Sequence, residues 1–169
     1  VLVKGAVYDR GGSSTNRVEA EALVAEIVRR LRDPVERERS LGVVTFSRAQ
    51  QALVEDLLEE AREQWPEIDP LFDPEVRAEP VFVKNLENVQ GDERDVVLFS
   101  VGYGPDASGK VRANMGPLGQ RGGERRLNVA ITRARQQLVM FVSFEPDQLD
   151  LSGTSARGLH DLEAFLQSA

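Results

Sequence analysis

Short apolar runs alternate along this chain with segments whose apolar residues recur every three or four positions. This alternation limits the possible folds more than any other feature of the sequence. A continuous apolar run is typical of a strand buried on both faces, and the longer spacing is typical of a helix packed along one face. Alternating strands and helices predict an α/β fold, a doubly wound, mostly parallel sheet of about five strands flanked by helices. The expected strands are 2–8, 41–46, 80–86, 95–103 and 137–144.

Two of the expected helices begin at residues that cap helices well. Asn16 is followed three positions later by Glu19, and Ser47 is followed three positions later by Gln50. Each pair matches the capping-box pattern, in which both side chains satisfy free backbone N–H groups at a helix start. The sequence therefore predicts one helix after Asn16 and another after Ser47.

The second half of the chain predicts two more helices. One is expected at about 124–136, after a glycine-rich loop at 104–123, and the last follows Thr154 or Ser155 as its cap. The segment 65–80 contains four prolines, so it is expected to be a loop.

Composition bounds the class of protein. A chain of 169 residues can form one domain with a real core, and we expect 1–169 to be a single domain. No apolar run is long enough to span a membrane, and no leader is recognisable, so a cytoplasmic protein is expected. There is no cysteine and only one histidine, so no metal-ligating residue is predicted.

One glycine-rich segment imitates a phosphate-binding loop. Residues 104–110 match the pattern G-x-x-x-x-G-K, but Val111 stands where such a loop needs Ser or Thr. The residues after it are too rich in glycine and proline for the required helix. A solvated loop is therefore expected here, and a self-contained flavodoxin-like enzyme that uses this loop is kept as a rival interpretation.

Four arginines lie close together in an otherwise apolar segment, although the chain carries a formal net charge of −7. On a helix with 100° per residue, Arg126 and Arg133 lie about 20° apart at the border of the apolar face. They are therefore expected to be partly buried, whereas Arg125 and Arg135 are expected on the surface. A half-buried guanidinium needs an anionic partner. Spacing alone favours an internal salt bridge, and a phosphate is the alternative.

A second polar segment separates two expected strands. Ligands of parallel α/β sheets gather at the carboxyl ends of the strands. The turn at Gln90–Gly91 is expected to place residues 92–94 at that edge. Glu93 could accept hydrogen bonds from a ribose hydroxyl, and Gln90 and Asn85 offer neutral contacts. Taken alone, a polar turn explains this segment better than a binding site.

Several segments together resemble the second RecA-like domain of superfamily 1 helicases, in particular the group of the nonsense-mediated-decay helicase. RRLNVAITRAR (125–135) is similar to motif VI of that family, ENVQGDERDVVLFS (87–100) to motif V, and LGVVTFSRAQQ (41–51) to motif IV. Residues 16–20 resemble an N-R-x-E-A stretch found there. The closing SARGLHDLEAFLQ (155–167) is similar to the segment after motif VI in large bacterial helicase-related proteins.

The resemblance implies a role for each nucleotide-facing residue. Arg133 matches the arginine finger that reaches the γ-phosphate of ATP, and Glu93 matches the motif V glutamate near the ribose and phosphates. Gln90 and Gly91 match the pair that shapes this loop. Arg126 is implied to be a structural partner within motif VI or a second nucleotide contact.

The resemblance also implies contacts with single-stranded DNA or RNA. Thr45 and Ser47 match positions where motif IV approaches the nucleic-acid backbone. Asn85 stands where relatives often carry Ser or Thr for a phosphate contact, so this sequence departs from the pattern there.

The resemblance further implies a partner and a cofactor. ATP and Mg²⁺ would be bound mainly by the N-terminal RecA-like domain of the same protein, whose phosphate loop and acidic pair belong upstream of this segment. The expected function is the C-terminal motor domain of an ATP-dependent helicase or translocase, monomeric and inactive as an isolated fragment. The alternative is a non-catalytic nucleic-acid-binding or interaction module with the same fold.

Overall fold

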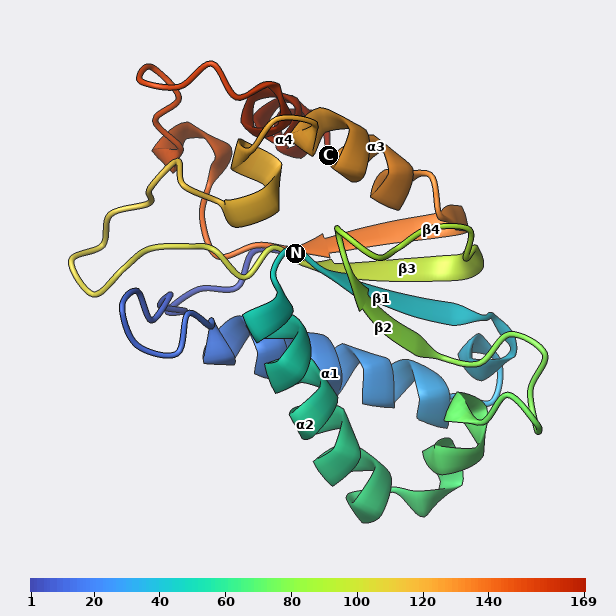
Figure 1. The fold of residues 1–169 in the computed structure, drawn as a ribbon. Helices are drawn as coiled ribbons and strands as arrows, with labels where there is room; N and C mark the ends of the chain where they lie inside the picture. Colours follow the sequence, from blue (N-terminus) through green and yellow to red (C-terminus); the bar gives the residue numbers. More distant parts are fainter.

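The computed structural model describes residues 1–169 and contains one parallel sheet between two layers of helices (Figure 1). Its strand order is β2-β1-β3-β4, so the chain crosses over β1 to pass from β2 to β3. The predicted doubly wound, parallel α/β fold is therefore confirmed, with four strands in place of about five. The strands are β1 Leu41–Thr45, β2 Phe82–Asn85, β3 Arg94–Ser100 and β4 Ala134–Phe141.

The predicted strand at 2–8 is wrong, because this segment pairs with the sheet at only one residue. Leu2 forms an isolated parallel bridge with Val142, and Val3 donates its backbone N–H to the Val142 carbonyl at 2.7 Å. Gly5 then takes a positive φ of 73°, a conformation that turns the chain and favours glycine. The apolar character of 2–8 reflects partial burial against the end of β4 rather than a full strand.

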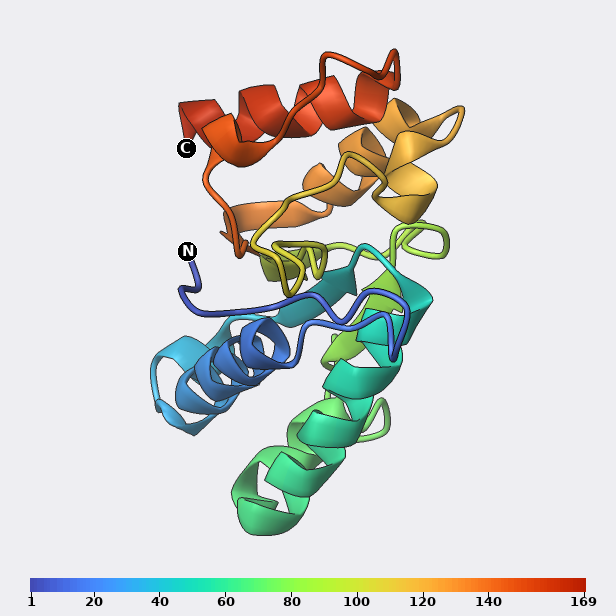
Figure 2. The same ribbon diagram turned by 90° about the vertical axis from the view of Figure 1, so that its left-hand side faces the viewer.

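Two helices cover each face of the sheet. Helices α1 (Arg17–Arg32) and α2 (Arg48–Gln64) pack on one face, and α3 (Gly123–Ile131) and α4 (Arg157–Ser168) pack on the other (Figures 1 and 2). The core is correspondingly split into two apolar clusters, one on each side of the sheet. No helix is long and apolar enough to cross a membrane.

Helix α3 is shorter than the helix predicted at 124–136. It ends at Ile131, and β4 already begins at Ala134. Arg133 lies in the turn between them, where its carbonyl accepts a hydrogen bond at 3.0 Å from the backbone N–H of Arg94. Pairing with β3 thus ends the helix, although the residues after Arg133 would suit a helix by propensity alone.

The segment 65–80, predicted as a loop, contains one short 3₁₀ helix at Pro66–Phe72.

The last helix follows the predicted capping region, but its N-cap is Ala156, whose methyl side chain cannot form a hydrogen bond. The Thr154 hydroxyl instead accepts a hydrogen bond at 3.1 Å from the backbone N–H of Ala156.

Both predicted capping boxes form only in their first half. The Asn16 side chain accepts from the backbone N–H of Glu19, and the Ser47 hydroxyl accepts from that of Gln50, each at 3.1 Å. The Glu19 carboxylate accepts from the Asn16 side-chain amide at 3.4 Å and not from the Asn16 backbone N–H. The Gln50 side chain accepts from the backbone N–H of Asn16 at 2.9 Å and not from that of Ser47. Both side chains turn toward the sheet and join one buried polar network.

The Glu19 carboxylate is the centre of this network and is fully buried. It accepts hydrogen bonds from the Ser100 hydroxyl and the Gly102 N–H, both at 2.7 Å, and from the Ser143 hydroxyl at 2.5 Å. The Gln50 amide donates to Ser100 at 3.1 Å and to the Asn16 carbonyl at 3.0 Å. The network therefore joins α1 and α2 to the carboxyl ends of β3 and β4.

Burial raises the pKa of Glu19 to about 7, although its hydroxyl and N–H donors act in the opposite direction. A carboxyl group with a raised pKa binds its proton more tightly in the folded chain than in the unfolded chain. The contribution of Glu19 to the free energy of unfolding is therefore largest at acid pH, and it falls as the pH rises from 4.5 to about 7.

We expect Glu19→Gln to reduce this pH dependence, because glutamine carries no ionisable proton. The measurement is the free energy of unfolding in urea at several pH values between about 5 and 8, where one pKa unit corresponds to about 1.4 kcal/mol. Glu59→Gln, at an exposed position of α2, is the matched control and should keep the wild-type slope. A Glu19→Gln slope equal to that of the wild type would contradict the assignment.

Candidate functional site

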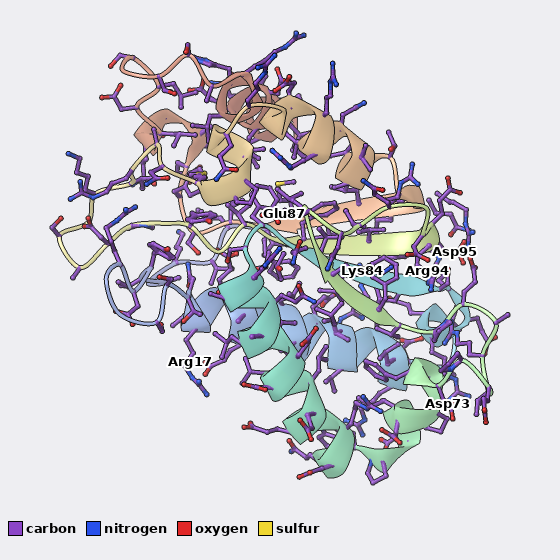
Figure 3. The ribbon with its side chains drawn as sticks, in the orientation of Figure 1. Arg17, Asp73, Lys84, Glu87, Arg94 and Asp95 are labelled. Atoms are coloured by element: carbon purple, nitrogen blue, oxygen red, sulfur yellow. The ribbon has the colours of Figure 1, made fainter.

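The predicted site residues lie at two opposite edges of the sheet. Thr45 and Asn85 are paired at the carboxyl ends of β1 and β2, whereas Arg94 and Ala134 are paired at the amino ends of β3 and β4. The placement of residues 92–94 at the carboxyl edge is therefore wrong. The chain from 86 to 93 runs back along the sheet before β3 begins, and Figure 3 shows Glu87 well separated from Arg94 and Asp95.

Arg133 lies at the amino edge, immediately after α3. Its Nε donates to the Val129 carbonyl at 3.1 Å, and its Nη2 contacts the Thr132 hydroxyl at 3.3 Å. It forms no ion pair, although the chain has 28 acidic residues. The carbonyl end of a helix carries partial negative charge, which holds a guanidinium without neutralising it. Arg133 is thus half-buried and positioned without a carboxylate within ion-pair distance.

Glu93 lies beside Arg133 in the fold, because its neighbour Arg94 bonds to the Arg133 carbonyl. Glu93 is exposed, and its carboxylate has no hydrogen-bond partner. Arg94 is only 8% exposed and donates to the carbonyls of Glu93 at 2.8 Å and Pro80 at 3.0 Å. Arg94 therefore fixes the backbone that carries Glu93 and leaves the Glu93 carboxylate free.

The loop before Glu93 has the shape that the sequence predicts. Gly91 has a positive φ of 78°, and both Gln90 and Gly91 are exposed. Asp92 forms an ion pair with Lys84 of β2, and the hydrogen bond from Lys84 lowers the pKa of Asp92. The Lys84–Asp92 pair anchors this loop to the sheet, a contact for which local sequence gives no signal.

The arginines of the α3 segment have partners other than those predicted. Arg126 is half-buried as expected, but its Nη1 donates to the carbonyls of Pro117 at 3.1 Å and Arg121 at 3.2 Å. The internal salt bridge favoured for Arg126 and Arg133 is therefore wrong for both. Arg125 and Arg135 are exposed, as expected, and Arg135 also forms ion pairs with Glu79 at 2.5 Å and Asp95 at 3.0 Å.

At the carboxyl edge, two of the three residues predicted to meet nucleic acid are buried. Thr45 is fully buried and donates its hydroxyl to the Ser47 carbonyl at 2.8 Å. Asn85 is 3% exposed, and its amide donates to Gln51 at 2.7 Å. Ser47 is half-buried at the start of α2. The contacts of all three with nucleic acid stay predictions, and Ser47 has the most accessible side chain.

In the segment 104–110, which imitates a phosphate loop, backbone N–H groups donate hydrogen bonds to the side chain of Asp106 from the same segment. Asp106 accepts hydrogen bonds from the backbone N–H groups of Ser108 at 2.9 Å and Lys110 at 3.1 Å. Its hydrogen bonds with Ser108 and Lys110 lower the pKa of Asp106 to about 2, so the carboxyl is ionised at neutral pH. An ionised carboxylate in this position repels phosphate, and no helix begins directly after Lys110. The geometry disfavours the flavodoxin-like rival.

Comparison with known proteins identifies one family and two named relatives. Residues 4–145 match the AAA domain family. A Mycoplasma pneumoniae protein named as an uncharacterized ATP-dependent helicase is 36% identical over 151 residues, which are 87% of this chain and 13% of that protein. A Mycoplasma genitalium protein of the same description is 39% identical over 130 residues, which are 72% of this chain and 10% of that protein.

Among solved structures, the C-terminal domain of a possible DNA helicase from Lactobacillus plantarum is similar with a TM-score of 0.41. The sequence identity is 21%, and the alignment covers 73% of this chain and 67% of that chain. By contrast, this chain spans only a small part of the length of the two Mycoplasma proteins described above.

We expect Arg126→Ala to lower the free energy of unfolding by roughly 1–3 kcal/mol, because two carbonyls lose a charged donor. Arg125→Ala, at the adjacent exposed position, should change it by less than about 0.5 kcal/mol. Urea unfolding of both variants at neutral pH makes the comparison. Equal stabilities would show that Arg126 does not hold the loop before α3.

Proposed function

We propose that this chain, which belongs to the AAA domain family, is the C-terminal motor domain of an ATP-dependent helicase or translocase acting on DNA or RNA. The predicted resemblance to helicases is supported by two relatives whose names describe them as ATP-dependent helicases. We further propose that the chain is one part of a longer polypeptide, whose N-terminal RecA-like domain binds ATP and Mg²⁺.

The observation that supports this function most strongly is the state of Arg133. A half-buried guanidinium normally has a carboxylate partner, because leaving it uncompensated is costly. Arg133 has only a helix-end carbonyl and a neighbouring hydroxyl, at 3.1 Å and 3.3 Å. Its full charge is therefore free to meet an anion supplied by another domain, and a γ-phosphate fits that requirement.

The residues around Arg133 fit a nucleotide held between two domains. When bound, ATP supplies the phosphoryl group, and Mg²⁺ neutralises charge on its phosphate oxygens. Arg133 would leave the α3 carbonyls and stabilise the negative charge of the transition state. Glu93 would accept a hydrogen bond from a ribose hydroxyl, and Gln90 and Gly91 would shape the loop that carries it. Arg126 would hold the loop before α3, with a direct nucleotide contact as its second possibility.

No group of three or more acidic or histidine side chains in this chain is arranged to hold a metal ion. The proposal assigns Mg²⁺ to acidic residues of the other domain. In the proposed motor, the present chain contributes positive charge to the reaction rather than metal ligands.

Single-stranded nucleic acid would bind at the carboxyl edge of the sheet. There Ser47 offers a hydroxyl near the backbone N–H groups at the start of α2, a place that favours phosphate. Thr45 and Asn85 are proposed to contribute by holding Ser47 and the loop after β2 in position. ATP-driven closure at the amino edge would then move this grip along the strand.

The alternative is a nucleic-acid-binding or interaction module with the same fold and no motor activity. It would share the carboxyl edge but would not need the free guanidinium of Arg133. A phosphate loop and an acidic pair encoded upstream in the same reading frame favour the motor, and their absence favours the module.

We expect Arg133→Ala in the full-length protein to lower kcat for ATP hydrolysis about 10³-fold or more, as for arginine fingers elsewhere. Affinity for single-stranded nucleic acid should change little, because Arg133 lies at the opposite edge of the sheet. Steady-state ATPase assays and equilibrium binding measure the two quantities. Arg17→Ala on α1, an exposed arginine paired with Glu21, is the control. Near-normal turnover by Arg133→Ala would remove the finger role.

The 169-residue chain alone should show no Mg²⁺-dependent ATP hydrolysis, because its only phosphate-loop-like segment is occupied by Asp106. A sensitive phosphate-release assay with the purified chain tests this expectation. Turnover above background that disappears on adding a chelator would contradict it.

A further inference from the structure

Three side chains that the sequence does not single out form a row at the carboxyl edge. The rings of Tyr8 and Tyr103 have centroids 5.3 Å apart with planes inclined by 50°. The guanidinium carbon of Arg10 lies 5.4 Å from the Tyr8 ring centroid. Arg10 is exposed, and its side chain forms no ion pair and no hydrogen bond. Arg10 therefore lies over the ring as a charged, planar group that is open to a ligand.

The row is held in place from behind. Tyr8 donates its backbone N–H to the Pro105 carbonyl at 2.8 Å, and the N-terminal loop and the loop after β3 lie side by side (Figures 1 and 2). Gly102, just before Tyr103, is bonded to the buried Glu19 carboxylate. The Ser47 side chain lies beside the Tyr103 hydroxyl. The row thus continues from Ser47, the proposed contact with nucleic acid, toward Arg10.

A hollow of about 460 Å³ lies beside Tyr8 and Arg10 at one end of this row, within the size range of ligand-binding pockets. Its lining includes Tyr8, Arg10 and the carboxylates of Asp9 and Asp106. Hydrogen bonds from Ser13 lower the pKa of Asp9, so both carboxylates are ionised at neutral pH. Asp106 also forms an ion pair with Arg112 at 3.3 Å, so Asp9 contributes most of the unpaired negative charge. This charge disfavours a phosphate in the hollow and suits a neutral aromatic ring that bears amino groups, which is the chemistry of a nucleobase.

We propose that the Arg10–Tyr8–Tyr103 row stacks one base of a single strand whose backbone lies along the carboxyl edge. Arg10 provides the contact surface, because a guanidinium plane stacks on bases as aromatic rings do. Tyr8 and Tyr103 are positioning residues that hold the guanidinium plane of Arg10 in place. This inference rests on the proposed function, since it requires that a strand binds at this edge. It adds a base contact to a grip otherwise made through the backbone.

The test compares two probes of equal length and charge. Affinities are measured by fluorescence anisotropy for a labelled oligodeoxyadenylate of about 15 nucleotides, whose bases bear amino groups, and for an abasic oligonucleotide with the same backbone, at one fixed salt concentration. Arg10→Ala and Arg10→Lys are compared with wild type. Arg39→Ala is the matched control, because Arg39 is also an exposed arginine without an ion pair and lies before β1, at the opposite edge.

Wild type should bind the base-bearing strand more tightly than the abasic strand. Both Arg10 variants should lose about 3- to 10-fold in affinity for the base-bearing strand only. Lysine keeps the charge but not the plane, so a normal Arg10→Lys affinity would overturn stacking. Equal wild-type affinity for the two probes, or equal losses on both, would overturn the base site and leave the motor proposal intact. Binding of neither probe would instead overturn the proposed nucleic-acid grip together with the base site.

Discussion

A single buried carboxylate joins the two helices of one layer to the carboxyl edge of the sheet. Glu19 receives hydrogen bonds from the ends of both β3 and β4 and from the N–H of Gly102. A buried carboxylate is tolerated only when its acceptor positions are filled, so the loops that supply these donors have little freedom. Gln50 extends the same network to α2. The carboxyl edge is therefore rigid where we propose that it meets a nucleic-acid strand.

The sheet separates two kinds of chemistry. Its amino edge carries Arg133 and Glu93, a free cation and a free carboxylate held by backbone contacts of β3 and β4. Its carboxyl edge carries Ser47 and the Arg10–Tyr8–Tyr103 row. Because β1 and β3 are almost entirely buried between the helices, we expect the two edges to move together. A motor that closes on ATP at one edge would thus displace the other edge as a rigid body.

The sequence predicts those elements whose signals are local. The buried strands β1 and β3 were expected because a strand covered on both faces is apolar throughout. The end of α3 was not, since pairing between Arg94 and Arg133 overrides the helical preference of the residues after it. Likewise, the pattern around Glu19 predicts a capping box, but no local pattern reports a partner such as Ser143, 124 residues away. The motifs therefore predict the family better than they predict the contacts of individual residues, and the Arg10–Tyr8–Tyr103 row has no sequence signal at all.

We propose above all that the Arg133 guanidinium binds a phosphate held by another domain of the same polypeptide. A crystal structure of the full-length protein with ADP, Mg²⁺ and aluminium fluoride tests it most directly, because the fluoride mimics the transferring phosphoryl group. We predict that the Arg133 guanidinium leaves the Val129 carbonyl and lies within hydrogen-bonding distance of the fluoride. An Arg133 side chain still bonded to the end of α3, with another cation on the fluoride, would contradict the claim.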